Sequence, residues 1–270
     1  MRVLRRRLDS YANQLLPRGP LDVLRQVGIF AAAYCGYQMV RGVVGVSGGY
    51  KPFGDATKII DLERTLHVFV EPTIQNWVIG HAHWLMDIAD WSYLNAQFAL
   101  TIGVLVFIYL RHNDSFYFVR NMFVMSMLIA LVGYSVFPTA PPRLMPQWGF
   151  TDAIAQFTHV TIERGASSAF INAYAAVPSM HVCFALMVGL PMSRLVNNRL
   201  LKAAWRLYPP FIVFVVVATG NHYFTDVALG ALTAGVSAVA AKQLLARARP
   251  EAWAFTGRGH SDRTPASAAA

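Results

Sequence analysis

Six long apolar segments alternate with polar and basic stretches along the chain. Each has roughly the length, about 20 residues, that an α-helix needs to cross the hydrocarbon core of a bilayer. The pattern therefore predicts an all-α integral membrane bundle of six transmembrane helices. The segments lie near residues 27–46, 92–110, 120–137, 178–196, 207–221 and 223–245.

The stretch between the first two spans has a different pattern. Residues 65–90 mix apolar positions with a glutamate, a proline, three histidines and two aspartates. We expect an additional amphipathic helix that lies at the membrane interface or packs on the bundle. Glu71, Gln75 and His83 are candidates for contact with a lipid headgroup. Bound metal is a weaker alternative, because His81 and His83 are two residues apart and do not share a helix face.

The distribution of the 23 lysine and arginine residues sets the predicted topology. Most of them fall in the N-terminal arm, in loops near 111–120 and 194–206, and in the C-terminal tail. Because basic loops stay on the cytoplasmic side, six spans with both ends inside satisfy this bias. A further span over 65–90 would reverse every later loop. We therefore expect a multi-pass protein of the cell membrane.

The composition agrees with a membrane protein. Hydrophobic residues make up 55% of the chain and charged residues only 14%, against about 25% charged in soluble domains. The net charge is +9, and most of the basic residues that produce it flank the apolar spans. We therefore expect no nucleic-acid partner. The predicted parts are a cytoplasmic basic arm (1–26), the first transmembrane helix with the outer amphipathic segment (27–91), a transmembrane core (92–245) and a disordered cytoplasmic tail (246–270).

Three polar clusters fall at the outer ends of predicted spans. They have the sequences VFPTAPPRLMP, VPSMH and ATGNHYFTDVALG, and they contain Arg143, His181 and His222. Ionisable residues within or beside a bilayer are costly and mark function by default. Since the topology places all three clusters at one membrane depth, we expect a single site that faces the outer side.

The last cluster carries the clearest chemistry. His222 and Asp226 are four residues apart, which places them on one face of a helix that runs through both. A carboxylate that holds one imidazole nitrogen fixes the tautomer and leaves the other nitrogen as a base or nucleophile. Near lipid headgroups, that nitrogen could attack phosphorus. His181, when protonated, could then deliver a proton to the departing oxygen.

The remaining candidates are suited to hold phosphate oxygens. Pro178 fits the first turn of a helix, where exposed amides and the Ser179 hydroxyl can bind an anion. Arg143 follows a rigid Pro-Pro pair and offers a planar fork for the same oxygens. Asn221, beside the candidate nucleophile, is a further candidate for phosphate contact, and a structural role is its alternative.

Each assignment has a plainer alternative. His222 and Asp226 could form a structural polar pair at a helix junction, and Arg143 could anchor a span end by reaching to the lipid surface. Ser179 could act only at the start of a helix. His181, His222 and Asp226 could instead hold zinc.

These elements resemble the phosphatidic acid phosphatase type 2 superfamily, which also includes the vanadium haloperoxidases. Pro178 to His181 matches that family's Pro-Ser-x-His element, and His222 with Asp226 matches its final His-x-x-x-Asp. The resemblance covers roughly residues 92–245, which it identifies as the catalytic core. It implies that His222 forms a phosphohistidine, that Asp226 orients it and that His181 is the general acid, without metal or cofactor.

Two departures from the family pattern concern phosphate-binding cations. Val136 stands where the family's phosphatases carry a lysine, and Val216 stands where they carry an arginine. Leu144 also replaces the proline that usually follows the arginine of the first element. This pattern is more similar to the branch of fungal inositol phosphorylceramide synthases and their bacterial relatives. Since a phosphodiester carries less charge than a monoester, fewer cations suit it.

The resemblance therefore implies a membrane enzyme that transfers a phosphoryl or phospho-headgroup between lipids, in the manner of an inositolphosphotransferase. We expect a phospholipid or polyprenyl phosphate as substrate and a polyol or lipid hydroxyl as acceptor. One alternative is a lipid phosphate phosphatase that hydrolyses phosphatidic acid or polyprenyl diphosphate. An alternative of another class is a non-catalytic lipid-binding membrane protein, which the missing cations favour.

Overall fold

Helices make up the regular structure of the part of the chain that the computed structural model describes, residues 16–46, 51–158 and 174–245. No strand occurs within these ranges, so the all-α prediction is confirmed there. The predicted tail, 246–270, lies outside them. The helices are α2 (Pro20–Val46), α3 (Lys51–Thr65), α4 (Glu71–His81), α5 (His83–Trp91), α6 (Gln97–Arg111), α7 (Asn113–Val136), α8 (Ala153–Thr158), α9 (Met180–Leu195), α10 (Arg199–Ala218) and α11 (Phe224–Ala240).

Four of the described helical stretches are long and apolar enough to cross a membrane, and α9 is a shorter apolar helix. Large apolar side chains such as Phe98, Val132 and Leu232 are exposed on their surfaces, as expected where lipid replaces water. These features suggest a membrane protein, while the six-span arrangement remains a prediction. The four stretches are His83–Arg111, Asn113–Val136, Arg199–Ala218 and Phe224–Gln243.

The segment 65–90 is not a single amphipathic helix. The chain forms α4 and then enters a helix that runs from His83 to Arg111. The span predicted to begin near residue 92 therefore begins earlier, at His83. The pattern was misleading because polar residues of this segment, Glu71 and Asp90, are fully buried in the protein, whereas we expected Glu71 to contact a lipid headgroup.

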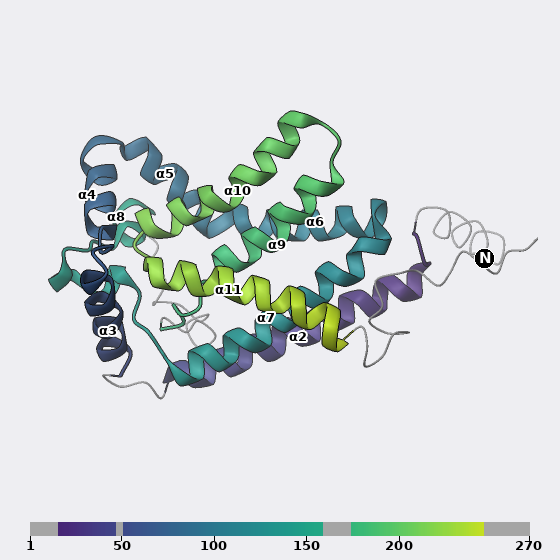
Figure 1. Cartoon of the computed structure of the whole chain (residues 1–270), viewed down its shortest axis with the longest axis horizontal. Coiled ribbons are helices and arrows are strands. Elements are labelled where there is room, and N and C mark those ends of the chain that lie inside the picture. The colour runs from purple at the N-terminus through teal and green to yellow at the C-terminus, as the bar shows by residue number, and fades with distance from the viewer. Residues whose placement is uncertain (1–15, 47–50, 159–173, 246–270) are drawn as a thin grey trace, which may run out of the picture.

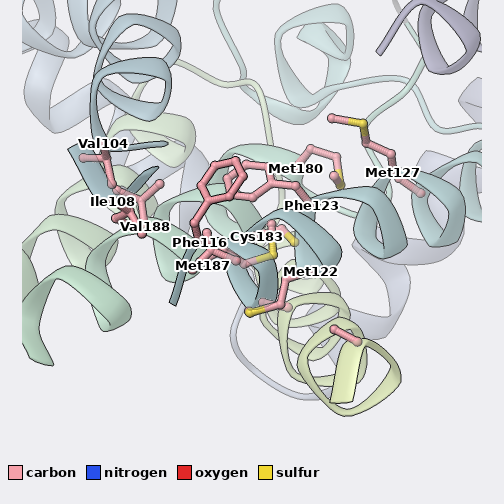
Figure 2. Close-up of a cluster of buried hydrophobic side chains, with 14 of the residues drawn as sticks. Val104, Ile108, Phe116, Met122, Phe123, Met127, Met180, Cys183, Met187 and Val188 are labelled. Carbon is pink, nitrogen blue, oxygen red and sulfur yellow. The ribbon is translucent and has the colours of Figure 1, made fainter. Parts of the chain in front are cut away.

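Helix α7 packs against α2, α6, α9 and α11, and Figure 1 shows it running alongside α2. Buried side chains of α6, α7 and α9 form a large apolar cluster that includes Phe123, Met127, Met180 and Met187 (Figure 2). Unbranched methionines fill irregular gaps between helices. This core fixes α9 against α7, and α9 begins at the candidate site.

The structure corrects the predicted place of Arg120. This residue belongs to α7 and is fully buried, not part of an inner loop. Its guanidinium donates hydrogen bonds to Gln26 Oε1 at 2.6 Å and to Asn121 Oδ1 at 2.8 Å. On the same side of α2, Asp22 accepts hydrogen bonds from the hydroxyls of Tyr109 and Tyr117. These polar contacts join α2 to α6 and α7.

The short helices α3, α4 and α8 gather at one end of the bundle, near the junction of α10 with α11 (Figure 1). A second apolar cluster holds α3 there, with Ile60, Met145 of the loop after α7, and Tyr223 of the junction among its buried members. A further cluster joins Val78 of α4 and Ala153 of α8 to Ala218 of α10. The loops that carry the candidate site residues are therefore fixed from outside the bundle by α3 and α4.

Candidate active site

The loop after α7 is tied to the turn between α10 and α11 by its backbone. Arg143 N donates to Gly220 O at 2.7 Å. Gly220 has a φ of +68°, and a Cβ there would lie 2.7 Å from Gln75 Nε2, so only glycine fits this turn. The first and last polar clusters of the sequence are thereby brought together.

His222 and Asp226 meet at the beginning of α11. Asp226 Oδ2 lies 3.3 Å from His222 Nδ1 and accepts a hydrogen bond from Tyr223 N at 3.0 Å. Both side chains are buried. A proton on Nδ1 then points at the carboxylate, which leaves the lone pair on Nε2. The ring of His222 is thus held in the orientation that a nucleophile or base requires.

The reason for this pairing differs from the one that the spacing indicated. Helix α11 begins at Phe224, so His222 precedes the helix. Asp226 is the third residue of α11 and reaches back to the cap residue, in a capping box. The carboxylate therefore binds the helix N-terminus and the imidazole together, and no continuous helical face through both residues is needed.

His181 lies in the first turn of α9, and its ring faces that of His222. The two ring centroids are 5.8 Å apart, with 56° between the planes. Tyr93 stacks on His181 with a centroid distance of 4.4 Å, and Gln97 Nε2 donates to His181 O at 2.6 Å. Both contacts come from the helical stretch His83–Arg111 and set the position of His181.

Ser179 is the N-cap of α9. Its Oγ lies 3.5 Å from Val182 N, and its own N–H donates to Asp226 O at 3.1 Å. Pro178 therefore precedes the cap and is not in the first helical turn. A Cβ at Gly230 would lie 2.4 Å from Ser179 O, so the start of α9 packs directly on the backbone of α11. The structure thus supports the helix-start alternative for Ser179.

Arg143 does not reach toward the lipid surface. Its side chain is 5% exposed, and its Nη1 lies 3.2 Å from Asp152 Oδ2. Its Nε donates to Asn221 Oδ1 at 3.2 Å. Asn221 Nδ2 in turn donates to Thr219 Oγ1 at 2.8 Å. The Asn221 carboxamide is therefore engaged at both ends and positions Arg143, which supports the structural alternative for Asn221.

Two of the headgroup candidates have internal partners. Gln75 donates to the carbonyls of Thr151 and Ala218 and accepts from Thr151 N. Glu71 Oε1 accepts from Phe224 N at 2.9 Å. Both side chains are fully buried, so they hold the site together from α4 and do not face a headgroup. His83 is exposed.

Sequence reasoning missed three residues around the site. Asp152 pairs with Arg143, and Tyr93 stacks on His181. Asp90 is fully buried, and neither of its oxygens accepts a hydrogen bond from the described part of the chain. For Asp90 the signal was available, because a carboxylate so close to an apolar run is costly unless it is used.

Among the residues that the structure describes, no group of three or more His, Cys, Asp or Glu side chains is arranged to hold a metal ion. The zinc alternative therefore has no ligand set in these ranges.

The family model of the PAP2 superfamily matches residues 57–240. This range covers more than half of the chain, and the chain belongs to that superfamily, as the resemblance predicted. Comparisons with curated proteins and with solved structures gave no match. Membership suggests a phosphatase or phosphotransferase and implies lipid phosphate substrates and a place in the membrane. The matched range begins before residue 92 and includes α4 and most of α3.

Proposed function

We propose that the protein transfers a phospho-headgroup from one lipid to a hydroxyl acceptor through a phosphohistidine at His222, as an inositolphosphotransferase does. The observation that carries this proposal is the dyad itself: Asp226 binds His222 on one nitrogen, and the His181 ring lies 5.8 Å from the His222 ring. A nucleophile with a fixed tautomer and a neighbouring acid are the two groups that such a transfer needs.

The reaction proceeds in two balanced steps. In the first, His222 Nε2 forms a bond to phosphorus while the bond from phosphorus to the lipid alcohol breaks, and His181 gives a proton to the departing oxygen. In the second, the acceptor hydroxyl loses its proton to His181, its oxygen bonds to phosphorus and the phosphorus–nitrogen bond breaks. One alcohol replaces another on phosphorus, and both imidazoles return to their starting state. Arg143 and nearby amides stabilise the charge on the phosphate oxygens.

The charge balance of the site favours a phosphodiester donor. Val136 and Val216 stand where the superfamily's phosphatases are expected to carry cations, and Arg143 already shares its charge with Asp152. A phosphodiester has one negative charge at neutral pH, whereas a phosphomonoester carries nearly two. We therefore infer a phospholipid donor, with a polyol or lipid hydroxyl as acceptor. The positive-inside bias supports a cell-membrane enzyme whose site faces the outer side.

The test is a panel of substrates offered to the purified full chain in detergent: phosphatidylinositol, phosphatidic acid and a polyprenyl diphosphate, with and without a lipid alcohol. We expect new phospholipid from the diester donor and none from His222→Ala. Release of free phosphate from the other two donors would instead identify a lipid phosphate phosphatase. Binding without turnover would favour the non-catalytic alternative, and turnover that persists in His222→Ala would rule out the proposed nucleophile.

A further inference from the structure

Three successive backbone amides at the beginning of α11 each donate to a carboxylate. Tyr223 N binds Asp226, Phe224 N binds Glu71 Oε1 at 2.9 Å, and Thr225 N binds Glu63 Oε1 at 2.6 Å. Helix N-termini leave such amides without partners and favour negative charge. What is unusual here is that two of the three carboxylates come from other helices, α3 and α4.

The two glutamates are buried and lie next to each other. Glu63 is 1% exposed and Glu71 is 0% exposed, and their Oε1 atoms accept from the consecutive amides of Thr225 and Phe224. The second oxygen of each, Oε2, accepts no hydrogen bond from an N–H or O–H group of the described residues. Two buried carboxylates in contact cannot both stay ionised, and a hydrogen bond between them requires a proton on one.

We propose that Glu63 and Glu71 share one proton and act as a positioning pair, which fixes the start of α11 and so holds the His222–Asp226 dyad in place. The shared proton joins the two facing oxygens, and the other two oxygens accept the amides of Phe224 and Thr225. The pairing is inferred from the burial of the two side chains and from their consecutive amide donors, whereas its effect on catalysis rests on the proposed role of His222.

The pair should respond to pH in a defined direction. Burial, and then the hydrogen bond with Glu71, raise the pKa of Glu63 to about 8. The groups that face the pair are Tyr223, just before α11, and the Asp226 carboxylate within it. Because the pKa of Glu63 is raised on folding, its contribution to stability is complete in acid and is lost as pH rises through about 8. Above that pH the two ionised carboxylates repel each other, and they move apart at the beginning of α11.

The test uses carboxamide variants, because an amide can replace a protonated carboxyl but not an ionised one. In Glu63→Gln or Glu71→Gln, the remaining carboxylate accepts from the new NH₂ group, and both backbone amides keep their acceptors. In the double variant, two NH₂ groups face each other. Asp61→Asn, an exposed carboxylate on the same helix α3, is the matched control.

We expect each single variant to keep activity at neutral pH and to lose the alkaline fall that wild type and Asp61→Asn show near pH 8. The double variant should lose at least ~10-fold in turnover, because its buried donors lack acceptors. The proposal of a shared proton would be wrong if both single variants kept the alkaline fall in activity. It would also be wrong if the single variants lost as much activity as the double variant.

Thermal unfolding of the same five proteins in detergent between pH 5 and 10 separates this inference from the proposed function. The melting temperature of wild type should fall as pH rises from the ordinary glutamate value of 4.5 to about 8 and level off above it, and those of the single variants should fall less. This readout needs no turnover, so it tests the pair even if the substrate panel shows no enzyme. Equal pH dependence in wild type and both single variants would contradict the pair while leaving the His222 experiment unaffected.

Discussion

At the scale of the residue, the role of His222 depends on which nitrogen carries the proton. With Asp226 ionised, the contact of 3.3 Å between Nδ1 and Asp226 Oδ2 favours the tautomer with the proton on Nδ1, because a carboxylate only accepts hydrogen bonds. The same oxygen also accepts Tyr223 N. One carboxylate therefore sets both the tautomer of the imidazole and the start of the helix.

Asp226→Asn removes the charge of this carboxylate and keeps an acceptor at its place. The Asn oxygen can occupy the position of Oδ2, where it accepts Tyr223 N and faces His222 Nδ1. We expect kcat to fall by at least ~100-fold while the protein stays folded, since a neutral amide no longer stabilises the positive charge that the imidazole gains when Nε2 bonds to phosphorus. Steady-state kinetics and a melting curve measure this. An unchanged kcat would show that the carboxylate is only a helix cap.

The sequence predicted some of these residues and missed others for a physical reason. His181, His222 and Asp226 could be found because their spacing and their place beside apolar runs are local properties. Asp152 and Glu63 could not be found in this way, because their importance comes from partners that are distant in sequence, Arg143 and the amide of Thr225.

At the scale of the element, the site depends on how closely α9 approaches α11. Ser179 O lies where a side chain on residue 230 would have to begin, and Ser179 N donates to Asp226 O. Small residues let helix backbones approach in this way. The distance between the two histidine rings is thus set in part by a glycine that has no chemistry of its own.

Gly230→Ala tests this contact. Its Cβ would lie 2.4 Å from Ser179 O, so we expect a loss of about 1–3 kcal/mol in unfolding free energy together with reduced turnover. Gly235→Ala on the same helix is the control, because nothing lies within 4 Å of its Cβ. This control should be neutral or stabilising by up to ~1 kcal/mol through helix propensity. Equal melting temperatures for the two variants would contradict the close packing.

The long apolar helices were predictable from the sequence, while the region between residues 51 and 91 was not. A run of apolar residues has one low-energy outcome in a bilayer. Polar residues such as Glu71, Gln75 and Asp90 have two outcomes, headgroup contact or burial against protein, and only the tertiary structure decides between them. All three are buried.

At the scale of the whole molecule, the candidate site occupies one end of the bundle and the connection from α9 to α10 the other. Charge counting predicts that the site end lies outside, because basic loops stay on the cytoplasmic side. The position of the site then decides which leaflet supplies the donor lipid.

Cysteine labelling measures this orientation. In a chain without its native Cys35 and Cys183, we expect Gln147→Cys, at the site end, to react with a membrane-impermeant thiol reagent in intact cells. Asn197→Cys, between α9 and α10, should react only after permeabilisation. Both positions are exposed, so accessibility alone does not favour either one. Labelling in the reverse order would place the site on the cytoplasmic side.

The central claim is that phosphorus becomes bonded to His222 during turnover. The most direct measurement is to mix the protein with a ³²P-labelled phospholipid donor, quench within one turnover and digest it for mass spectrometry. We predict an acid-labile, alkali-stable label on His222 that a hydroxyl acceptor removes and that His222→Ala lacks. Turnover without any covalent label, or with the label on another residue, would contradict this account.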